Sequence, residues 1–307
     1  MKARLDKVDP DLKASLDAFP GFDISSELLP KIRQFPAKPP HQTPNYTEIF
    51  IGAEGENTPL RCLIIDPIPD DEKRPVLLYY HGGGFVFGSP EITLPTAQKL
   101  AENIGCLVIL LDYRLAPEHP FPAALEDGLR VLSWLDSNAD RLRLDKTCIA
   151  IGGDSAGGGH AIVLTAEALD KDGIKPSSLF LVYPMLDNVT GINGNGGTSI
   201  WTPANNRYGW NSYLGTGDIT EKILSRAVPS KIKNLQNFPH TFLATGTLDL
   251  FFNENLTFVE RLKKQGVEVE QHVFEGAYHA FDVLVPEAKI SKRFHKSCVS
   301  YLKRQFK

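Results

Sequence analysis

Short apolar runs alternate with longer amphipathic stretches over most of the chain after about residue 46. Runs of about four to eight residues rich in Val, Ile, Leu and Phe predict buried strands, whereas apolar residues three and four positions apart predict helices. Strands that alternate with helices are typical of a mostly parallel sheet with helices on both faces. The predicted strands are Glu48–Ile51, Leu60–Ile65, Val76–Tyr80, Leu107–Leu111, Cys148–Ile151, Leu179–Tyr183, Thr241–Ala244 and Val267–Phe274, and the predicted helices are Glu91–Ile104, Ala123–Ser137, Ala156–Asp170, Asn253–Gln265 and Pro286–Arg304.

The N-terminal region departs from this alternation. Apolar residues at helical spacing predict two amphipathic helices, one over Leu5–Phe19 and one over Ile24–Ile32. The segment 35–44 then contains four prolines, which block a helix and favour an extended connection. We therefore expect residues 1–45 to form a separate region and residues 46–307 to form the main domain. A turn around Glu54–Asn57 predicts that this domain begins with an antiparallel hairpin.

A second departure lies between Tyr183 and Thr241, where about 55 residues separate two predicted strands. The segment contains an Asn/Gly-rich stretch, 193–197, and an aromatic stretch, Trp201–Gly215. Because a connection of this length is uncommon in a compact domain, we expect an insertion at about 185–225 with a function of its own.

Composition narrows the classes of protein and partner. The 307 residues include 33 Lys and Arg against 37 Asp and Glu, for a net charge of −4, and no Lys/Arg-rich block is present. Nucleic acid is therefore not an expected partner. The longest apolar runs, such as Cys106–Leu111, are too short to span a bilayer, and the N-terminus carries charges where a signal peptide has its apolar core. We expect a cytoplasmic protein without a membrane span.

The four cysteines are scattered along the chain and form no CxxC pair. Three of them lie in apolar stretches, which favours reduced, buried thiols over disulfides or a metal site. No metal site is expected.

A candidate nucleophile lies in Gly153-Asp154-Ser155-Ala156-Gly157, directly after a predicted strand and before a predicted helix. This G-x-S-x-G motif in a strand–turn–helix context is typical of the nucleophile elbow, where small residues allow a sharp turn that exposes the serine hydroxyl. The alternative is a glycine-rich turn without chemistry, and the strand and helix around the motif favour the functional interpretation.

Donors for an oxyanion are predicted in His81-Gly82-Gly83-Gly84, which follows the strand Val76–Tyr80. Glycines allow backbone N–H groups to face a substrate oxygen, and the Ala156 N–H at the start of the next helix is a further candidate. The alternative is a flexible or phosphate-binding glycine loop, but no Gly-Lys-Ser/Thr follows as a P-loop requires.

The general base is predicted from position along the chain. Of the eight histidines, His279 lies just past the last predicted strand, at the edge of the sheet where the active sites of α/β proteins gather. Hydrolases of this fold place an acid between serine and histidine in the sequence, and Asp249 follows a strand at the same edge. Asp187 and Glu254 are rival candidates for the acid, and strand-end position favours Asp249.

These stretches together resemble the hormone-sensitive-lipase-like carboxylesterases, also called bacterial family IV esterases, of the α/β-hydrolase fold. The resemblance covers nearly everything from about residue 46 onward. The sequence departs from the family pattern at three places. These are Leu250-Phe251-Phe252 after Asp249, Ala280 where glycine is usual, and Gly159 where asparagine is usual. The stretches that carry the resemblance are HGGGF from His81, YRLAPEHPFPAALED from Tyr113, GDSAGG from Gly153, YPMLD from Tyr183 and the neighbourhoods of Asp249 and His279.

The resemblance implies an α/β-hydrolase fold with an eight-stranded, mostly parallel sheet and a helical cap formed by residues 1–45 and the insertion. It implies hydrolysis of short- to medium-chain acyl esters, a small-molecule ester substrate, no metal or cofactor, and a homodimer formed through the last strand and helix. The site residues that it implies are Ser155, Asp249 and His279 as the triad and Gly83, Gly84 and Ala156 as the oxyanion hole.

Aromatic residues near the glycine loop and in the insertion are candidate walls of a substrate pocket, although each of them taken singly is as readily explained by packing. They are Phe85, Phe87, Trp201, Tyr208, Trp210 and Tyr213. Two other functions are compatible with the same fold. One is a catalytically silent ligand receptor, which would be expected to lack a triad residue, and the other is a lyase or acyltransferase.

Overall fold

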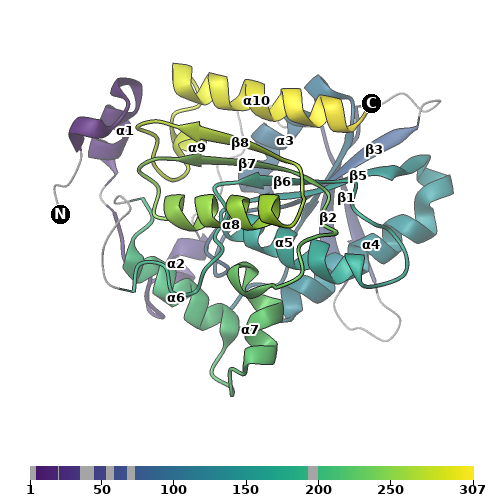
Figure 1. The fold of residues 1–307 in the computed structure, drawn as a ribbon, viewed down its shortest axis with the longest axis horizontal. Helices are drawn as coiled ribbons and strands as arrows, with labels where there is room; N and C mark the ends of the chain where they lie inside the picture. Colours follow the sequence, from purple (N-terminus) through teal and green to yellow (C-terminus); the bar gives the residue numbers. More distant parts are fainter. Residues whose placement is uncertain (1–4, 20, 35–44, 53–58, 68–72, 193–199) are drawn as a thin grey trace.

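In the part of the chain that the structure describes, eight strands form one sheet, as the sequence predicts. The computed structural model describes residues 5–19, 21–34, 45–52, 59–67, 73–192 and 200–307. The strand order is β1-β2-β4-β3-β5-β6-β7-β8; among these strands of the described residues, β2 points in the opposite direction to the other seven (Figure 1). The strands are β1 Thr47–Ile51, β2 Leu60–Ile65, β3 Arg74–Tyr80, β4 Leu107–Leu111, β5 Leu144–Asp154, β6 Ser178–Val182, β7 His240–Gly246 and β8 Val269–Phe274.

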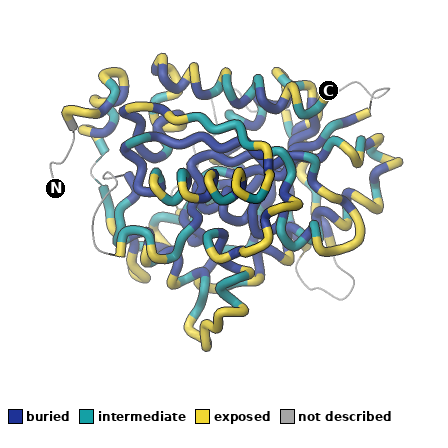
Figure 2. The backbone as a smooth tube through the Cα atoms, viewed as in Figure 1, coloured by how far each residue is buried: buried dark blue, intermediate teal, exposed yellow. Residues whose placement is uncertain are grey.

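Helices cover both faces of this sheet. Alternate side chains of β3 explain how: Val76, Leu78 and Tyr80 face one core, whereas Leu77 and Tyr79 face the other. The first core is covered by α4 (Ala123–Leu142), α5 (Ala156–Leu169) and α8 (Phe252–Lys264), and the second by α3 (Pro90–Ile104) and α10 (Lys289–Gln305). Figure 2 shows the sheet as a buried layer between half-exposed helices. The predicted α/β-hydrolase fold is confirmed.

The first N-terminal stretch is helical but broken. Instead of one helix over Leu5–Phe19, it forms two 3₁₀ turns, Leu5–Lys7 and Pro10–Leu12, followed by α1 (Lys13–Ala18). Pro10 explains the break, since proline lacks the N–H that a continuous helix would use and is tolerated only at a helix start. The apolar residues on which this prediction rests are nevertheless packed inside, since Val8, Leu12 and Leu16 are buried.

The two N-terminal stretches dock at different places (Figure 1). Leu12 and Leu16 join the core beneath α10, together with Tyr278 from the segment after β8. The second stretch forms α2 (Leu29–Gln34) and lies beside α6 (Pro203–Leu214), where the Ile24 N–H donates to Asn205 Oδ1 at 2.7 Å.

The long insertion contains α6 and α7 (Glu221–Ala227), which lie together below the sheet in Figure 1. Their apolar side chains, with those of α2 and the loop after β3, form a third core that includes Ile24, Phe85, Trp201, Trp210 and Phe251. The predicted segments 35–44, Glu54–Asn57 and 193–197 lie outside the described residues.

Two chemical expectations can be compared with the described part of the chain. No disulfide forms there, and Cys62, Cys106 and Cys298 are buried free thiols. Among the same residues, no group of three or more His, Cys, Asp and Glu side chains could hold a metal ion. None of the helices in those ranges is long and apolar enough to cross a membrane.

His160 on α5 predicts acid sensitivity of the fold. Its ring is buried against those of Phe85, Tyr113 and Tyr213, and burial lowers the pKa of His160 to about 3. The unfolded chain binds this proton near pH 6.5, so the stability associated with neutral His160 is present above that pH and is lost as the pH falls toward 3. We expect His160 to account for about 2 kcal/mol of stability lost between pH 7 and pH 5.

Urea unfolding of the wild type, His160→Phe and His160→Gln at both pH values would measure this loss. The two variants should show a smaller loss, whereas His119→Gln, at an exposed position, should behave as the wild type does. An equal loss in all four proteins would contradict the assignment.

Candidate active site

The turn at Ser155 joins β5 to α5 and adopts a backbone conformation that is rare for a residue with a side chain, φ 53° and ψ −121°. Its N–H donates to the Val182 carbonyl at 2.9 Å, which ties the turn to the end of β6. The turn is tight because Gly157 lies against the end of β3: a Cβ on Gly157 would be only 2.2 Å from the Tyr80 carbonyl oxygen. The glycines of the motif are thus required by close backbone contact, as predicted.

His279 lies next to Ser155 although 124 positions separate them in the sequence. His279 Nε2 is 2.9 Å from Ser155 Oγ, and His279 Nδ1 is 2.8 Å from Asp249 Oδ2. The other carboxylate oxygen of Asp249 accepts the Phe251 N–H at 2.9 Å. All three residues are buried, with exposed fractions of 5–6%. The structure therefore brings together the three residues that were predicted as a triad.

The two rival acids have other partners. Glu254 accepts hydrogen bonds from the Leu186 N–H at 2.6 Å and from the Thr190 hydroxyl, which fixes the loop after β6 on α8. Burial raises the pKa of Glu254 well above its usual value, and these hydrogen bonds act in the opposite direction. Asp187 accepts the Val189 N–H within its own loop. Both carboxylates are used to shape this loop.

The glycine loop after β3 lies beside the serine turn. Gly83 and Gly84 adopt φ values of 127° and 57°, which are unfavourable for other residues. A Cβ on Gly84 would lie 2.1 Å from Cη2 of Trp201, so the indole covers this glycine. Among the described residues, no hydrogen bond uses the N–H groups of Gly83, Gly84 and Ala156. These three amides are therefore available as donors to a ligand oxygen.

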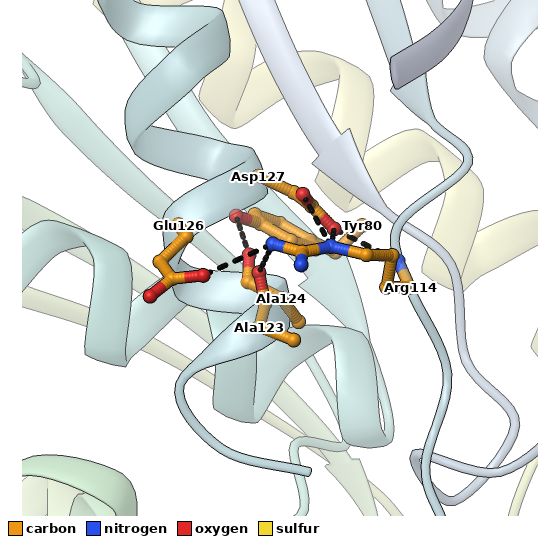
Figure 3. Close-up of polar contacts among 6 residues, drawn as sticks. All are labelled: Tyr80, Arg114, Ala123, Ala124, Glu126 and Asp127. Carbon is orange, nitrogen blue, oxygen red and sulfur yellow. Dashed lines mark hydrogen bonds and ion pairs between the residues drawn. The ribbon is translucent and has the colours of Figure 1, made fainter. Parts of the chain in front are cut away.

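The stretch Tyr113–Asp127 supports the glycine loop from outside. Figure 3 shows the Arg114 guanidinium clamped on the start of α4, where Nε is 2.9 Å from Asp127 Oδ1 and a terminal nitrogen donates to the Ala123 carbonyl at 3.0 Å. Asp127 is buried, and burial raises its pKa although the Arg114 contacts lower it. At the other end of the stretch, the Tyr113 hydroxyl donates to the His81 carbonyl at 2.9 Å. The motif thus holds the loop that carries the three glycines.

The six aromatic residues predicted as pocket walls separate into two groups. Phe85, Trp210 and Tyr213 are buried and pack against one another, with ring centroids 4.3–5.8 Å apart, so they form the packing between the glycine loop and α6. Trp201 lies beside the predicted triad, with its ring 6.4 Å from that of His279 and 6.4 Å from that of Phe87. Tyr208 is half-buried, and its hydroxyl is 3.4 Å from that of Ser26.

Sequence reasoning missed several contacts of the site. The Phe251 ring stands at 90° to the His279 ring with centroids 5.1 Å apart, although the Phe251-Phe252 pair had been marked as a departure from the family. Arg33 on α2 donates to the carbonyls of Val86 and Ala116, both at 2.7 Å, and pairs with Glu118. No local sequence motif predicts these contacts of Arg33, because its partners lie more than 50 positions away in the chain.

This fold and this arrangement of Ser155, His279 and Asp249 define the α/β-hydrolase class. The sequence pattern of the alpha/beta hydrolase fold family matches residues 77–283, so the chain belongs to this family. Among curated proteins, it is 31% identical over 288 residues to esterase LipI of Mycobacterium tuberculosis, with 89% of this chain and 88% of LipI covered. Among solved structures, it superposes on a bacterial heroin esterase with a TM-score of 0.91, at 30% identity and with 99% of each chain covered.

The predicted resemblance to family IV esterases is thereby confirmed, and the protein is a serine carboxylic ester hydrolase. A more distant relative is a receptor by name. Gibberellin receptor GID1B of Arabidopsis thaliana is 27% identical over 277 residues, which cover 86% of this chain and 73% of the receptor.

Ala280, next to His279, stands where the family usually has glycine, and its φ of 58° lies in the left-handed region. A Cβ is strained in this conformation, so Ala280→Gly should raise the free energy of unfolding by about 1 kcal/mol. Urea unfolding would measure the change. Ala168→Gly within α5 is the matched control and should lower stability by about 1 kcal/mol. A loss of similar size at both positions would contradict the strain at Ala280.

Proposed function

We propose that the protein hydrolyses short- to medium-chain acyl esters through a covalent acyl-enzyme formed on Ser155. The observation that carries the proposal is the chain of two hydrogen bonds from Ser155 Oγ through His279 to Asp249, at 2.9 and 2.8 Å. A serine hydroxyl becomes an effective nucleophile when a positioned base accepts its proton.

The first half of the reaction transfers the acyl group. Ser155 Oγ forms a bond to the ester carbonyl carbon while its proton moves to His279 Nε2. The carbonyl π electrons move onto oxygen, where the amides of Gly83, Gly84 and Ala156 stabilise the negative charge. When the intermediate collapses, the bond to the alcohol oxygen breaks and His279 protonates the leaving alcohol.

In the second half, water repeats these steps with the acyl-enzyme. The water oxygen bonds to the acyl carbon while His279 accepts a proton from the water. His279 then gives this proton to Ser155 Oγ as the bond between Oγ and the acyl carbon breaks and the carboxylic acid leaves. Asp249 fixes the tautomer of the neutral imidazole through Nδ1 and stabilises the imidazolium that forms. No step calls for a metal or cofactor.

Two other functions compete with this proposal. A silent receptor is suggested by the likeness to GID1B, but the hydrogen-bonded Ser155, His279 and Asp249 favour catalysis. A lyase or acyltransferase could use the same oxyanion donors, and analysis of the products separates these reactions from hydrolysis.

The cytoplasmic location and the homodimer remain predictions from sequence. Sedimentation velocity tests the homodimer.

The proposal predicts that Ser155→Ala removes ester hydrolysis. In a panel of p-nitrophenyl esters from acetate to palmitate, we expect kcat/KM to be highest for the short acyl chains. The variant should lose about 10,000-fold or more of this activity. Ser291→Ala, at a buried serine of α10, is the matched control and should keep it. Undiminished activity in Ser155→Ala would refute the nucleophile, and ligand binding without turnover in the wild type would favour the receptor.

Trp201 predicts the limit on acyl length, because its indole covers Gly84 and approaches His279. Trp201→Ala should create space beside the oxyanion donors and raise the ratio of kcat/KM for octanoate to that for acetate by about tenfold. Trp134→Ala, a half-buried tryptophan of α4, is the control and should leave the ratio unchanged. An unchanged ratio in Trp201→Ala would remove Trp201 from the acyl pocket.

A further inference from the structure

Tyr183, the residue that follows β6, is held in an unfavourable conformation against His279. Its φ of 35° lies in the left-handed region, which is rare for a bulky residue and costs free energy. Its N–H donates to the Ala244 carbonyl at 2.7 Å, which fixes the backbone at this point. The Tyr183 ring then meets the His279 ring edge to face, with centroids 4.8 Å apart and an interplanar angle of 62°. Strain of this kind persists only where surrounding contacts enforce it.

The hydroxyl of Tyr183 is bonded to the segment that carries His279. Its oxygen lies 2.8 Å from Asp282 Oδ1. Asp282 belongs to the short helix α9 (Phe281–Leu284), which begins two residues after His279. Both side chains are buried, with exposed fractions of 1% for Tyr183 and 4% for Asp282. This one hydrogen bond therefore connects the end of β6 to the chain just after the base.

The Tyr183 side chain is packed in the core on one side and borders a small cavity on another. Tyr183 and Asp282 line a cavity of about 40 Å³, whose walls also include Asp154, Val182 and Phe294. On this side the two residues lack the close contacts that fix side chains in a filled core. On the cavity side, the hydrogen bond to Asp282 is therefore the contact that holds the Tyr183 hydroxyl. Burial raises the pKa of Asp282 and that of Tyr183, and a direct hydrogen bond satisfies both buried groups.

The imidazole needs such support because Asp249 holds only Nδ1. One hydrogen bond leaves the ring free to tilt about that contact, and a small tilt would move Nε2 away from Ser155 Oγ. The rings of Tyr183 and Phe251 lie 4.8 and 5.1 Å from the imidazole and restrict its plane. A displacement of about 1 Å between reacting groups can cost about 100-fold in rate.

We propose that Tyr183 and Asp282 are a positioning pair that holds the His279 imidazole in line with Ser155. The proposal rests on the proposed ester hydrolysis, since it concerns the same base. Neither residue touches the substrate; they act through His279. Tyr183 supplies the ring that abuts the imidazole, and Asp282 fixes that ring by its hydroxyl.

The test removes the hydrogen bond and keeps the ring. Tyr183→Phe should lower kcat for p-nitrophenyl acetate about tenfold and change KM less than about twofold, because substrate contacts remain. Reaction of Ser155 with a fluorophosphonate probe, followed by mass spectrometry, should slow by a similar factor. Asp282→Leu has no acceptor and should behave like Tyr183→Phe, whereas Asp282→Asn keeps a carbonyl oxygen and should restore activity to within about threefold of wild type.

Tyr301→Phe is the matched control. The Tyr301 hydroxyl is also buried and donates to the His240 carbonyl at 2.7 Å, but its ring packs on Phe242 and Phe180 in the core under α10. Its loss should lower the melting temperature and leave kcat and the labelling rate unchanged. The melting temperature of every variant is measured alongside.

Three results would overturn the positioning pair while hydrolysis stands: wild-type kcat and labelling in Tyr183→Phe, equal losses of kcat in Tyr183→Phe and Tyr301→Phe, or an Asp282→Asn variant as slow as Asp282→Leu. A failure of the wild-type protein itself would contradict the proposed function, and the positioning pair with it. In that case, the wild-type protein would neither hydrolyse any ester of the panel nor react with the probe at Ser155.

Discussion

The contact between α5 and the end of β3 is the constraint on which the site depends. Gly157 can lie against the Tyr80 carbonyl only because it has no side chain, and this close approach forces the chain at Ser155 into its sharp turn. The same contact brings the start of α5 beside the glycine loop, so one packing requirement aligns the serine hydroxyl and the amides of Gly83, Gly84 and Ala156. A bulkier residue at position 157 would separate the nucleophile from its donors.

The histidine side of the site is assembled by distant parts of the chain. The Asp9 N–H donates to the Gly276 carbonyl at 3.0 Å and the Tyr278 hydroxyl to the Leu12 carbonyl at 3.3 Å, so the N-terminal segment packs directly against the loop that carries His279. The Leu248 N–H ties the loop after β7 to Ala277 at 3.0 Å. The position of the base therefore depends on contacts made by the first turns of the chain, well outside the family-matched region.

The α/β-hydrolase fold by itself does not determine the function of a protein. Proteins similar in sequence to this chain include esterase LipI and gibberellin receptor GID1B, which match 89% and 86% of it. Ester hydrolysis by this route requires a local arrangement of a nucleophile, a base and an acid, together with amides that face the substrate oxygen. In this protein, His279 lies within hydrogen-bonding distance of both Ser155 and Asp249, and the Trp201 indole covers Gly84 in the neighbouring glycine loop.

Contiguous signals made much of the protein predictable. The alternation of apolar runs specified eight strands and the major helices, and the motifs around His81 and Ser155 specified the glycine loop and the nucleophile, because residues close in sequence act together there. Only the tertiary structure decided that Asp249 rather than Glu254 faces His279, that Phe85, Trp210 and Tyr213 pack while Trp201 covers Gly84, and that Tyr183 reaches Asp282. These outcomes depend on contacts between residues far apart in the chain, and a single sequence does not encode such distances in any local pattern.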